Sequence, residues 1–291
     1  MFTKDKLSLF FSMPLNTQDW NNLTYSKVTG VMMPYNPQIA DNTTLKEFGK
    51  RNLKVVLRLT PDDLDKLSLG EVQARMFEVK ELCSLRAIIV GNEPDDKFVH
   101  RYDSTDWGVD YCYNTHLPQL DKFRRTLQGH GVSILSPGWL QRNFTEGSPP
   151  EPGIVAWSRA AQPVYNEMDG NCIHIYGYGW HGLPAGFGEW PVDYMRFMNQ
   201  IRFWEMLWHK PIWIDESNID KGPEPEDAIP GPIRMRACMG MARTLRDNPI
   251  IGARVEFYCP FVSNGYGNHY PQGMVMNQPE AYEEVRTFMM E

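Results

Sequence analysis

The chain has 291 residues, of which 42% are hydrophobic and 22% charged, and its net charge at pH 7 is −7. This length and composition are typical of a globular protein with a large buried core, built as one large domain or two ordinary ones. The acidic balance and the absence of a basic run argue against nucleic acid and anionic membranes as partners, and no apolar run approaches the length of a membrane span.

Short apolar runs alternate with helical patterns along the whole chain. The helical patterns repeat apolar residues at a spacing of three and four, whereas the apolar runs are nearly continuous, as in strands covered on both faces. The predicted strands are 7–13, 28–34, 53–59, 85–91, 132–135, 171–176, 211–215 and 250–257. The predicted helices are 16–27, 44–52 (capped by Asn42 or Thr43), 71–83, 116–127, 154–168, 194–208, 233–246 and 279–290.

This order predicts an α/β protein in which residues 1–291 form a single (β/α)8 TIM barrel. The alternative is a doubly wound open sheet, whose nucleotide-binding form would require a GxGxxG motif after the first strand, and the sequence has none. Connections from helix to strand are short, whereas those from strand to helix are long and rich in Gly, Pro, aromatic and acidic residues. Barrel enzymes build their active sites from the strand-to-helix loops, so we expect the functional site on that face.

Five cysteines, an odd number without CxxC spacing, form neither a disulfide framework nor a zinc site. They favour a reducing compartment. The N-terminus fits a first strand better than a signal peptide. We therefore expect a cytoplasmic protein, or a secreted one whose signal has already been removed. The sequence does not indicate an oligomeric state.

Two of the predicted strands end on a glutamate. Glu93 follows the fourth strand and Glu216 follows the seventh. These strand ends lie on opposite sides of a barrel mouth, so the two carboxylates face each other across a bound ligand. Glycoside hydrolysis requires such a pair, one to protonate the leaving oxygen and one to attack or stabilise the anomeric carbon. A lone glutamate at a strand end is more often an ion-pair or capping residue, but two at these strands favour a catalytic pair.

The order of motifs resembles the clan of (β/α)8 retaining glycosidases that includes cellulases, mannanases, β-galactosidases and β-xylosidases. The resemblance rests on Asn92-Glu93, His174-x-Tyr176 and Glu216. It implies that Glu93 is the acid/base, that Glu216 is the nucleophile and that Asn92 binds the sugar 2-hydroxyl. It also implies that Tyr176 hydrogen-bonds Glu216 and that His174 lines the sugar subsite.

The sequence departs from this pattern at the eighth strand, where the clan usually has a Trp. Phe257 or Tyr258 is the expected substitute, and Tyr258 is our candidate. Glu256 is either an outward-facing partner of Arg254 or of a helix residue, or a third acid of the site. The clan's arginine near the nucleophile has Arg58 as its candidate, with a structural ion pair as the alternative.

Further aromatic residues lie in Gly- and Pro-rich loops, where Trp139 and Trp180 are candidates for stacking on sugar rings. Asp215 precedes Glu216 in the strand, and neighbouring strand residues point to opposite faces of the sheet. We therefore expect Asp215 to face the helices. The loop histidines His100, His181 and His269 lack close ligand spacing, and we expect no metal and no cofactor.

The predicted function is retaining hydrolysis of a glycoside, with an oligosaccharide, polysaccharide or simple glycoside as substrate. Two alternatives remain. One is a non-catalytic carbohydrate-binding barrel. The other is a barrel enzyme of different chemistry, such as a metal-dependent hydrolase or an aldolase.

Overall fold

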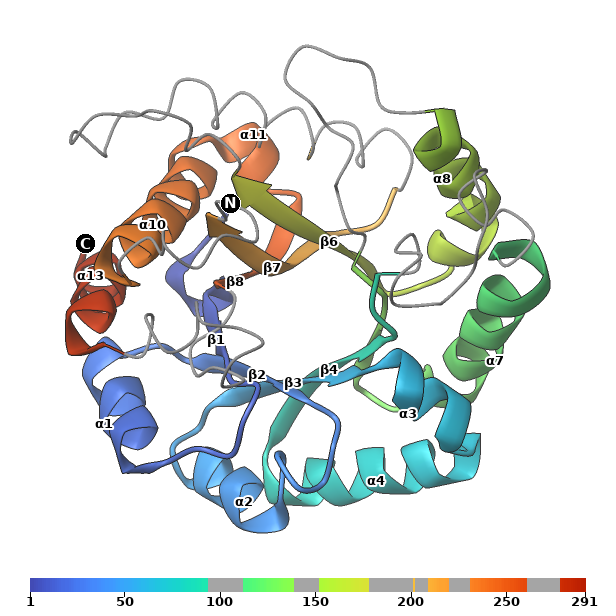
Figure 1. Cartoon of the computed structure of the whole chain (residues 1–291), viewed down its shortest axis with the longest axis horizontal. Coiled ribbons are helices and arrows are strands. Elements are labelled where there is room, and N and C mark those ends of the chain that lie inside the picture. Colours follow the sequence, from blue (N-terminus) through green and yellow to red (C-terminus); the bar gives the residue numbers. More distant parts are fainter. Residues whose placement is uncertain (94–111, 139–151, 178–200, 202–208, 220–230, 261–277) are drawn as a thin grey trace, which may run out of the picture.

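The computed structural model describes residues 1–93, 112–138, 152–177, 201, 209–219, 231–260 and 278–291. Within them, eight parallel strands form one sheet in chain order, and a bridge between Leu7 and Tyr258 brings the last strand back to the first. Figure 1 shows the strands ringed by helices. The predicted (β/α)8 barrel is therefore confirmed. The strands are β1 (Ser8–Phe10), β2 (Gly30–Pro34), β3 (Lys54–Leu59), β4 (Ser84–Val90), β5 (Ser133–Ser136), β6 (Gly170–Gly177), β7 (Ile212–Ile219) and β8 (Val255–Pro260).

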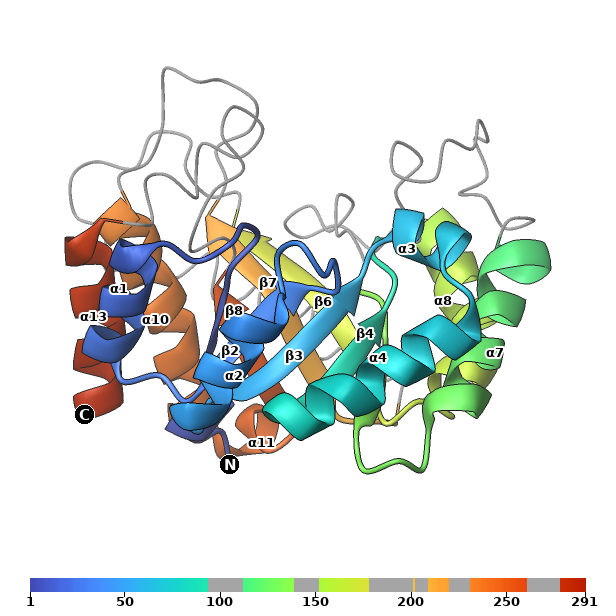
Figure 2. The same cartoon turned by 90° about the horizontal axis from the view of Figure 1, so that it is seen from below.

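The helices pack around the outside of the sheet, and Figure 2 shows α1, α10 and α13 grouped at one side of the barrel. α13 contacts both α1 and α10, which joins the two ends of the chain. The helical segments are η1 (Lys4–Lys6), α1 (Thr17–Ser26), α2 (Asn42–Lys50), α3 (Pro61–Lys66), α4 (Leu69–Leu82), η2 (Cys112–His116), α7 (Leu117–Leu127), α8 (Pro152–Tyr165), α10 (Gly231–Asp247), α11 (Pro249–Gly252) and α13 (Pro279–Met290).

Side-chain caps fix where several of these helices begin. Asn16, Thr60 and Ser68 each open a capping box, in which the cap side chain accepts from the backbone three residues on and the acidic residue there accepts in return. The Thr60 box starts α3, a short helix that the sequence patterns did not predict. α2 is capped by Asp41, not by Asn42 or Thr43 as expected, because the Asp41 carboxylate accepts from two backbone amides of the first turn.

The barrel interior is filled by one small apolar cluster, and a larger cluster lies between the sheet and the helices. Successive strand residues point to opposite faces, so each strand contributes to both clusters. This interior cluster closes the barrel beneath the strand ends and makes a floor for a site at the mouth. Its members are Phe10, Met32, Val56, Ala87, Ile89, Leu135, Cys172, Trp213, Phe257 and Cys259.

The eighth strand begins later than predicted. Residues 249–252 form the short helix α11, because Asn248 caps it and Pro249 occupies its first position. β8 starts only at Val255 and continues to Pro260, so Glu256 lies near its beginning rather than near its end. The predicted helix 194–208 falls outside the described residues except for Ile201.

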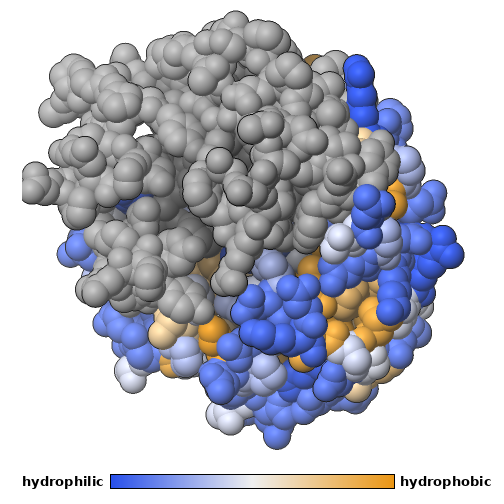
Figure 3. Space-filling view, turned by 45° about the vertical axis from the view of Figure 1, so that its right-hand side comes forward, coloured by the Kyte–Doolittle hydropathy of each residue, from blue (hydrophilic) through white to orange (hydrophobic). Residues whose placement is uncertain are grey.

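The surface in the described part of the chain is mainly polar. Figure 3 shows hydrophilic residues over most of the coloured face, with smaller hydrophobic areas between them. Large exposed apolar side chains are few and scattered, as is usual for a protein surface. No helix among the described residues is both long enough and apolar enough to cross a membrane.

Candidate active site

Glu93 and Glu216 lie at the carboxyl-end face of the barrel. The chain leaves β4 through Gly91, whose φ of +103°, rare for residues with a side chain, requires glycine, and reaches Glu93, which itself has a φ of +42°. The Glu93 amide donates to the carbonyl of Gly138, just beyond β5, at 2.9 Å. A left-handed backbone at a glutamate costs on the order of 1–3 kcal/mol and is characteristic of functional sites. The hydrogen bond to Gly138 therefore helps to hold this backbone conformation, from which the Glu93 side chain reaches the mouth.

A β-bulge in β7 places two neighbouring acids in the site. Ile173 pairs with Ile214 and His174 with Glu216, so β7 has one residue more than β6 at this point. The register toward β8 shifts between Ile214 and Ser217 as well. A bulge of this kind breaks the alternation of side chains and redirects them. Asp215 therefore faces the barrel interior beside Glu216, and our expectation that it faces the helices is wrong.

Arg58 and His174 connect these carboxylates. Arg58 Nη1 donates to Glu216 Oε1 and lies 3.8 Å from Asp215 Oδ2. His174 Nδ1 lies 3.1 Å from Glu93 Oε1 and 3.5 Å from Glu216 Oε2, while its Nε2 lies 3.5 Å from Asp215 Oδ2. Glu93, Glu216, Asp215, Arg58 and His174 are hereafter called the mouth cluster. Sequence reasoning missed only Asp215, because a bulge cannot be recognised from strand parity.

The mouth cluster is nearly shielded from solvent, so its charges interact strongly. The side chains of His174 and Asp215 are 0% exposed and those of Arg58 and Glu216 are 9% and 4% exposed, whereas Glu93 is the most open at 14%. Burial alone would lower the pKa of His174, but Glu216 and Asp215 and a hydrogen bond to Glu93 raise that pKa well above its ordinary value. Burial would also lower the pKa of Arg58, which Glu216 and Asp215 raise above its usual range instead. Both side chains therefore act as cations.

The two glutamates are close enough for a single sugar ring to contact both. One oxygen of Glu93, one oxygen of Glu216 and one His174 nitrogen lie within 4.8 Å of one another. Retaining glycosidases hold their carboxyl groups about 5–5.5 Å apart, while inverting ones need about 6.5–9.5 Å to admit a water. The two carboxylates therefore lie close together at the mouth. The same three atoms are also a donor set for a metal ion.

Gly138 packs its backbone directly against the cluster. A Cβ at this position would overlap His174 Nε2 and lie 2.7 Å from Asp215 Oδ1. Both side chains are fully buried and cannot move aside. We therefore expect Gly138→Ala to lower the free energy of unfolding by about 2 kcal/mol or more, as overpacking does elsewhere.

Urea unfolding measures this effect, with Gly70→Ala as the matched control. Gly70 lies in α4, where a Cβ would meet only Ser68 Oγ at 4.0 Å. That substitution should leave stability unchanged or raise it slightly, because alanine is the better helix former. Equal effects of the two substitutions would contradict the packing described for Gly138.

Among the remaining predicted residues, the structure places Tyr258 away from the mouth. Tyr258 is fully buried between the sheet and the helices, where its hydroxyl donates to the Cys238 carbonyl at 3.0 Å and lies 3.0 Å from Ser217 Oγ. It therefore does not reach the mouth, which corrects its assignment to substrate binding. Tyr176 lies two residues beyond His174 in β6, but its side chain is outside the described part of the chain. Trp139 and Trp180 also lie outside it.

The eighth strand contributes no aromatic floor to the mouth within its described residues. Phe257 stacks on Trp213 in the barrel interior, with ring centroids 5.1 Å apart. Glu256 pairs with Lys6 at 3.1 Å and lies 3.9 Å from Arg86, at the amino-terminal end of the barrel. It is therefore an ion-pair residue and not a third acid of the site, although its partners are not the predicted Arg254.

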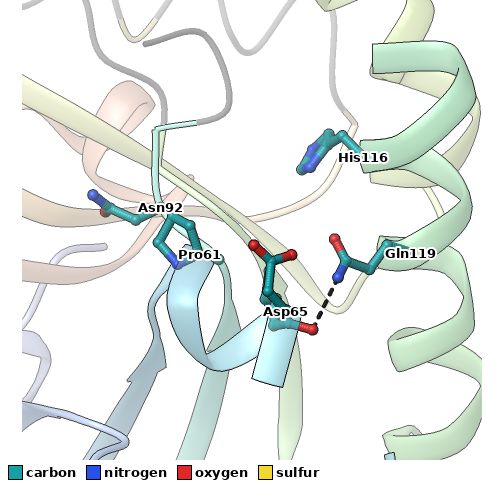
Figure 4. Close-up of a pocket in the computed structure, with 7 residues that line it drawn as sticks. Pro61, Asp65, Asn92, His116 and Gln119 are labelled. Atoms are coloured by element: carbon teal, nitrogen blue, oxygen red, sulfur yellow. Dashed lines mark hydrogen bonds between the residues drawn. The ribbon is translucent and has the colours of Figure 1, made fainter. Parts of the chain in front are cut away.

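A small pocket lies beside Asn92, the residue before Glu93 (Figure 4). In Figure 4, Asn92 points away from Asp65 and Gln119, so it stands at the border of the pocket. His116 Nε2 lies 3.2 Å from the Tyr165 hydroxyl. The pocket is lined by Pro61, Leu64, Asp65, Gly91, Asn92, His116 and Gln119.

Comparison with solved structures shows that the chain shares its fold with glycoside hydrolases of the retaining barrel clan over nearly its full length. A family 128 (subgroup I) endo-β-1,3-glucanase from Amycolatopsis mediterranei, solved with laminaritriose, matches at 13% identity and a TM-score of 0.63, covering 98% of this chain and 99% of that one. A 4-O-α-L-rhamnosyl-β-D-glucuronidase from Fusarium oxysporum 12S matches at 13% identity and a TM-score of 0.59, over 99% and 69% of the chains.

A family 51 α-L-arabinofuranosidase from Bifidobacterium longum matches at 11% identity and a TM-score of 0.57, over 90% and 67% of the chains. No protein-family model and no curated protein sequence matches this chain. At these identities the likeness establishes the fold, and the function has to be argued from the site.

Proposed function

We propose that the protein is a retaining glycoside hydrolase that acts on a β-linked oligo- or polysaccharide. The observation that carries the proposal is the facing pair of Glu93 and Glu216, with carboxylate oxygens within 4.8 Å, at the ends of β4 and in β7. Closely spaced carboxyl groups are typical of double displacement, whereas attack by an intervening water needs a wider pair. The shared fold supports a carbohydrate substrate, because the structural neighbours include a β-1,3-glucanase bound to its oligosaccharide.

The surroundings of each glutamate suit a different role. Glu216 is buried and bound to the Arg58 guanidinium, which keeps a carboxylate ionised and ready to attack the anomeric carbon. Glu93 is more open and accepts from His174 instead of Arg58. The protonated form of Glu93 gives its proton to the leaving oxygen in the first step, and the carboxylate that results takes a proton from water in the second. The different environments of the two carboxyls divide the acid and nucleophile roles between them.

Product stereochemistry tests this mechanism. The wild-type protein is incubated with β-1,3-, β-1,4- and β-1,6-linked glucan oligosaccharides and with aryl β-glycosides, and the first product is followed by proton NMR. We expect its anomeric proton to appear in the β configuration and only then to mutarotate. An initial α product would contradict the retaining mechanism.

Two variants serve as controls in the same assay. Glu93→Gln removes the proton donor and should slow cleavage by about 10²- to 10⁴-fold. Glu256→Gln removes a carboxylate of the ion pair with Lys6 at the opposite end of the barrel and should leave the rate unchanged. Oligosaccharide binding without turnover of any substrate in the panel would instead favour the non-catalytic barrel.

A further inference from the structure

The mouth cluster contains more negative charge than its own cations balance. Glu93, Asp215 and Glu216 carry −3 when ionised, and Arg58 and the His174 imidazolium carry +2, which leaves −1 in a nearly water-free space. Buried charge of this size has to be neutralised. One proton on a carboxyl group achieves this, and so does a divalent cation that displaces the proton from His174.

Three atoms of the cluster are arranged as ligands of such a cation. His174 Nδ1 lies 3.1 Å from Glu93 Oε1 and 3.5 Å from Glu216 Oε2. One ligand atom from each of the three residues lies within 4.8 Å of the other two. Zinc bonds of about 2.0–2.2 Å in a tetrahedron place neighbouring ligand atoms about 3.3–3.6 Å apart. The two distances from His174 Nδ1 to the glutamate oxygens are therefore close to those of a zinc site. A small movement of Glu93, the most exposed of the three residues, would bring the two glutamate oxygens to the same separation.

Asp215 is placed to support a metal-bound His174. It is fully buried, and within the described part of the chain neither of its oxygens makes a hydrogen bond of normal geometry. Its Oδ2 lies 3.5 Å from His174 Nε2, the ring nitrogen opposite the one that would bind metal. A carboxylate behind a ligating histidine is the usual support of metal centres, where it fixes the ring and raises its basicity.

We propose that Glu93, His174 and Glu216 bind one Zn²⁺ ion, with Asp215 as the supporting carboxylate, and that the bound ion blocks the site against substrate. Glu216 would bind through Oε2, because Oε1 belongs to Arg58. One imidazole and two carboxylates suit zinc, whereas Mg²⁺ and Ca²⁺ prefer oxygen ligands alone. Zinc and substrate compete because the ion occupies both glutamates. This competition rests on the proposed function, while zinc binding itself does not.

Calorimetric titration of the full-length protein, freed of metal with EDTA, with ZnCl₂ tests the site. We expect one Zn²⁺ per chain at this site. Glu93→Gln and His174→Gln should each weaken this binding at least about tenfold, and Asp215→Asn by about 10- to 100-fold. His209→Gln removes an exposed histidine and Glu256→Gln a distant carboxylate, so both should bind zinc as the wild type does. MgCl₂ should give no binding at this site.

The proposal would be overturned if Glu93→Gln and His174→Gln both bound zinc as tightly as the wild type. It would also be overturned if the wild type bound no zinc. Glu93→Gln is the decisive variant, because it conserves shape at the least buried ligand. In an active preparation, ZnCl₂ should raise the apparent KM of glycoside cleavage and EDTA should reverse the effect. Zinc binding without glycosidase activity would refute the proposed function alone, and an active enzyme that does not bind zinc would refute this inference alone.

Discussion

Glu216→Gly should lose turnover of a β-glycoside by on the order of 10⁴-fold or more, as enzymes do when a nucleophile is removed. Sodium azide should restore part of the rate with an activated aryl glycoside and give the α-glycosyl azide. The structure explains why an anion would enter: without the Glu216 carboxylate, Arg58 and His174 face the vacated space as cations. Azide then attacks the anomeric carbon from the side that Glu216 occupied, and the configuration inverts.

The identity of the azide product decides between the two glutamates. Glu93→Gly should also respond to azide, but with a β-azide, because the covalent intermediate on Glu216 still forms and the anion attacks it from the Glu93 side. An α-azide from Glu93→Gly and a β-azide from Glu216→Gly would reverse the two roles. Full activity in Glu216→Gly without azide would end the assignment. Glu216→Gln, which keeps the volume of the side chain, is the second variant if the glycine variant does not fold.

The fold was predictable because the barrel imposes the same local pattern eight times. Apolar runs such as 28–34 and 53–59 are covered on both faces, and the structure places β2 and β3 within them. The errors occurred where a tertiary contact or a cap overrides the pattern. Residues 250–252 look like the start of a strand, but the Asn248 cap turns them into α11. Propensity alone cannot distinguish the two.

The site was predictable for residues whose position at a strand end determines whether the side chain faces the barrel mouth. Glu93, His174 and Glu216 could be located in this way, and Arg58 lies two residues beyond the interior residue Val56. Asp215 could not, since period-two alternation assigns neighbours to opposite faces and only the bulge brings both inward. Tyr258 was misassigned because β8 starts later and its side chain points to the helices. The strand register of β7 and β8 therefore decides which of their residues belong to the site.

Arg58→Met should be the most destabilising of the conservative substitutions in the mouth cluster. Arg58 is buried, contacts both Glu216 and Asp215, and stacks over the ring of Phe10 with its Cζ 4.8 Å from the ring centroid. Methionine preserves the apolar contact but leaves two buried carboxylates without their guanidinium. Removing one partner of a buried ion pair typically costs about 3–5 kcal/mol. Urea unfolding followed by circular dichroism should show this loss.

Arg86→Met is the matched control for Arg58→Met, because it is the same substitution at the other end of the barrel. Arg86 also lies over aromatic rings, with its Cζ 4.7 Å from the Trp213 centroid, but its carboxylate partner Glu256 is 37% exposed. Water solvates that carboxylate when the arginine is removed, so the loss should be near 1 kcal/mol, the upper range for exposed pairs. Equal losses in Arg58→Met and Arg86→Met would contradict the charge argument.

The double variant Arg58→Met/Glu216→Gln then isolates the charge on Glu216. If the destabilisation by Arg58→Met comes from an uncompensated carboxylate, neutralising that carboxylate should recover part of the stability, with a coupling energy of about 0.5–3 kcal/mol in the double-mutant cycle. Strictly additive losses would place the effect of Arg58 in packing instead. Recovery of stability should not bring recovery of turnover, because the double variant lacks the carboxylate that attacks the sugar. The double variant would then recover stability without recovering activity, as expected if Arg58 serves chiefly to keep Glu216 ionised.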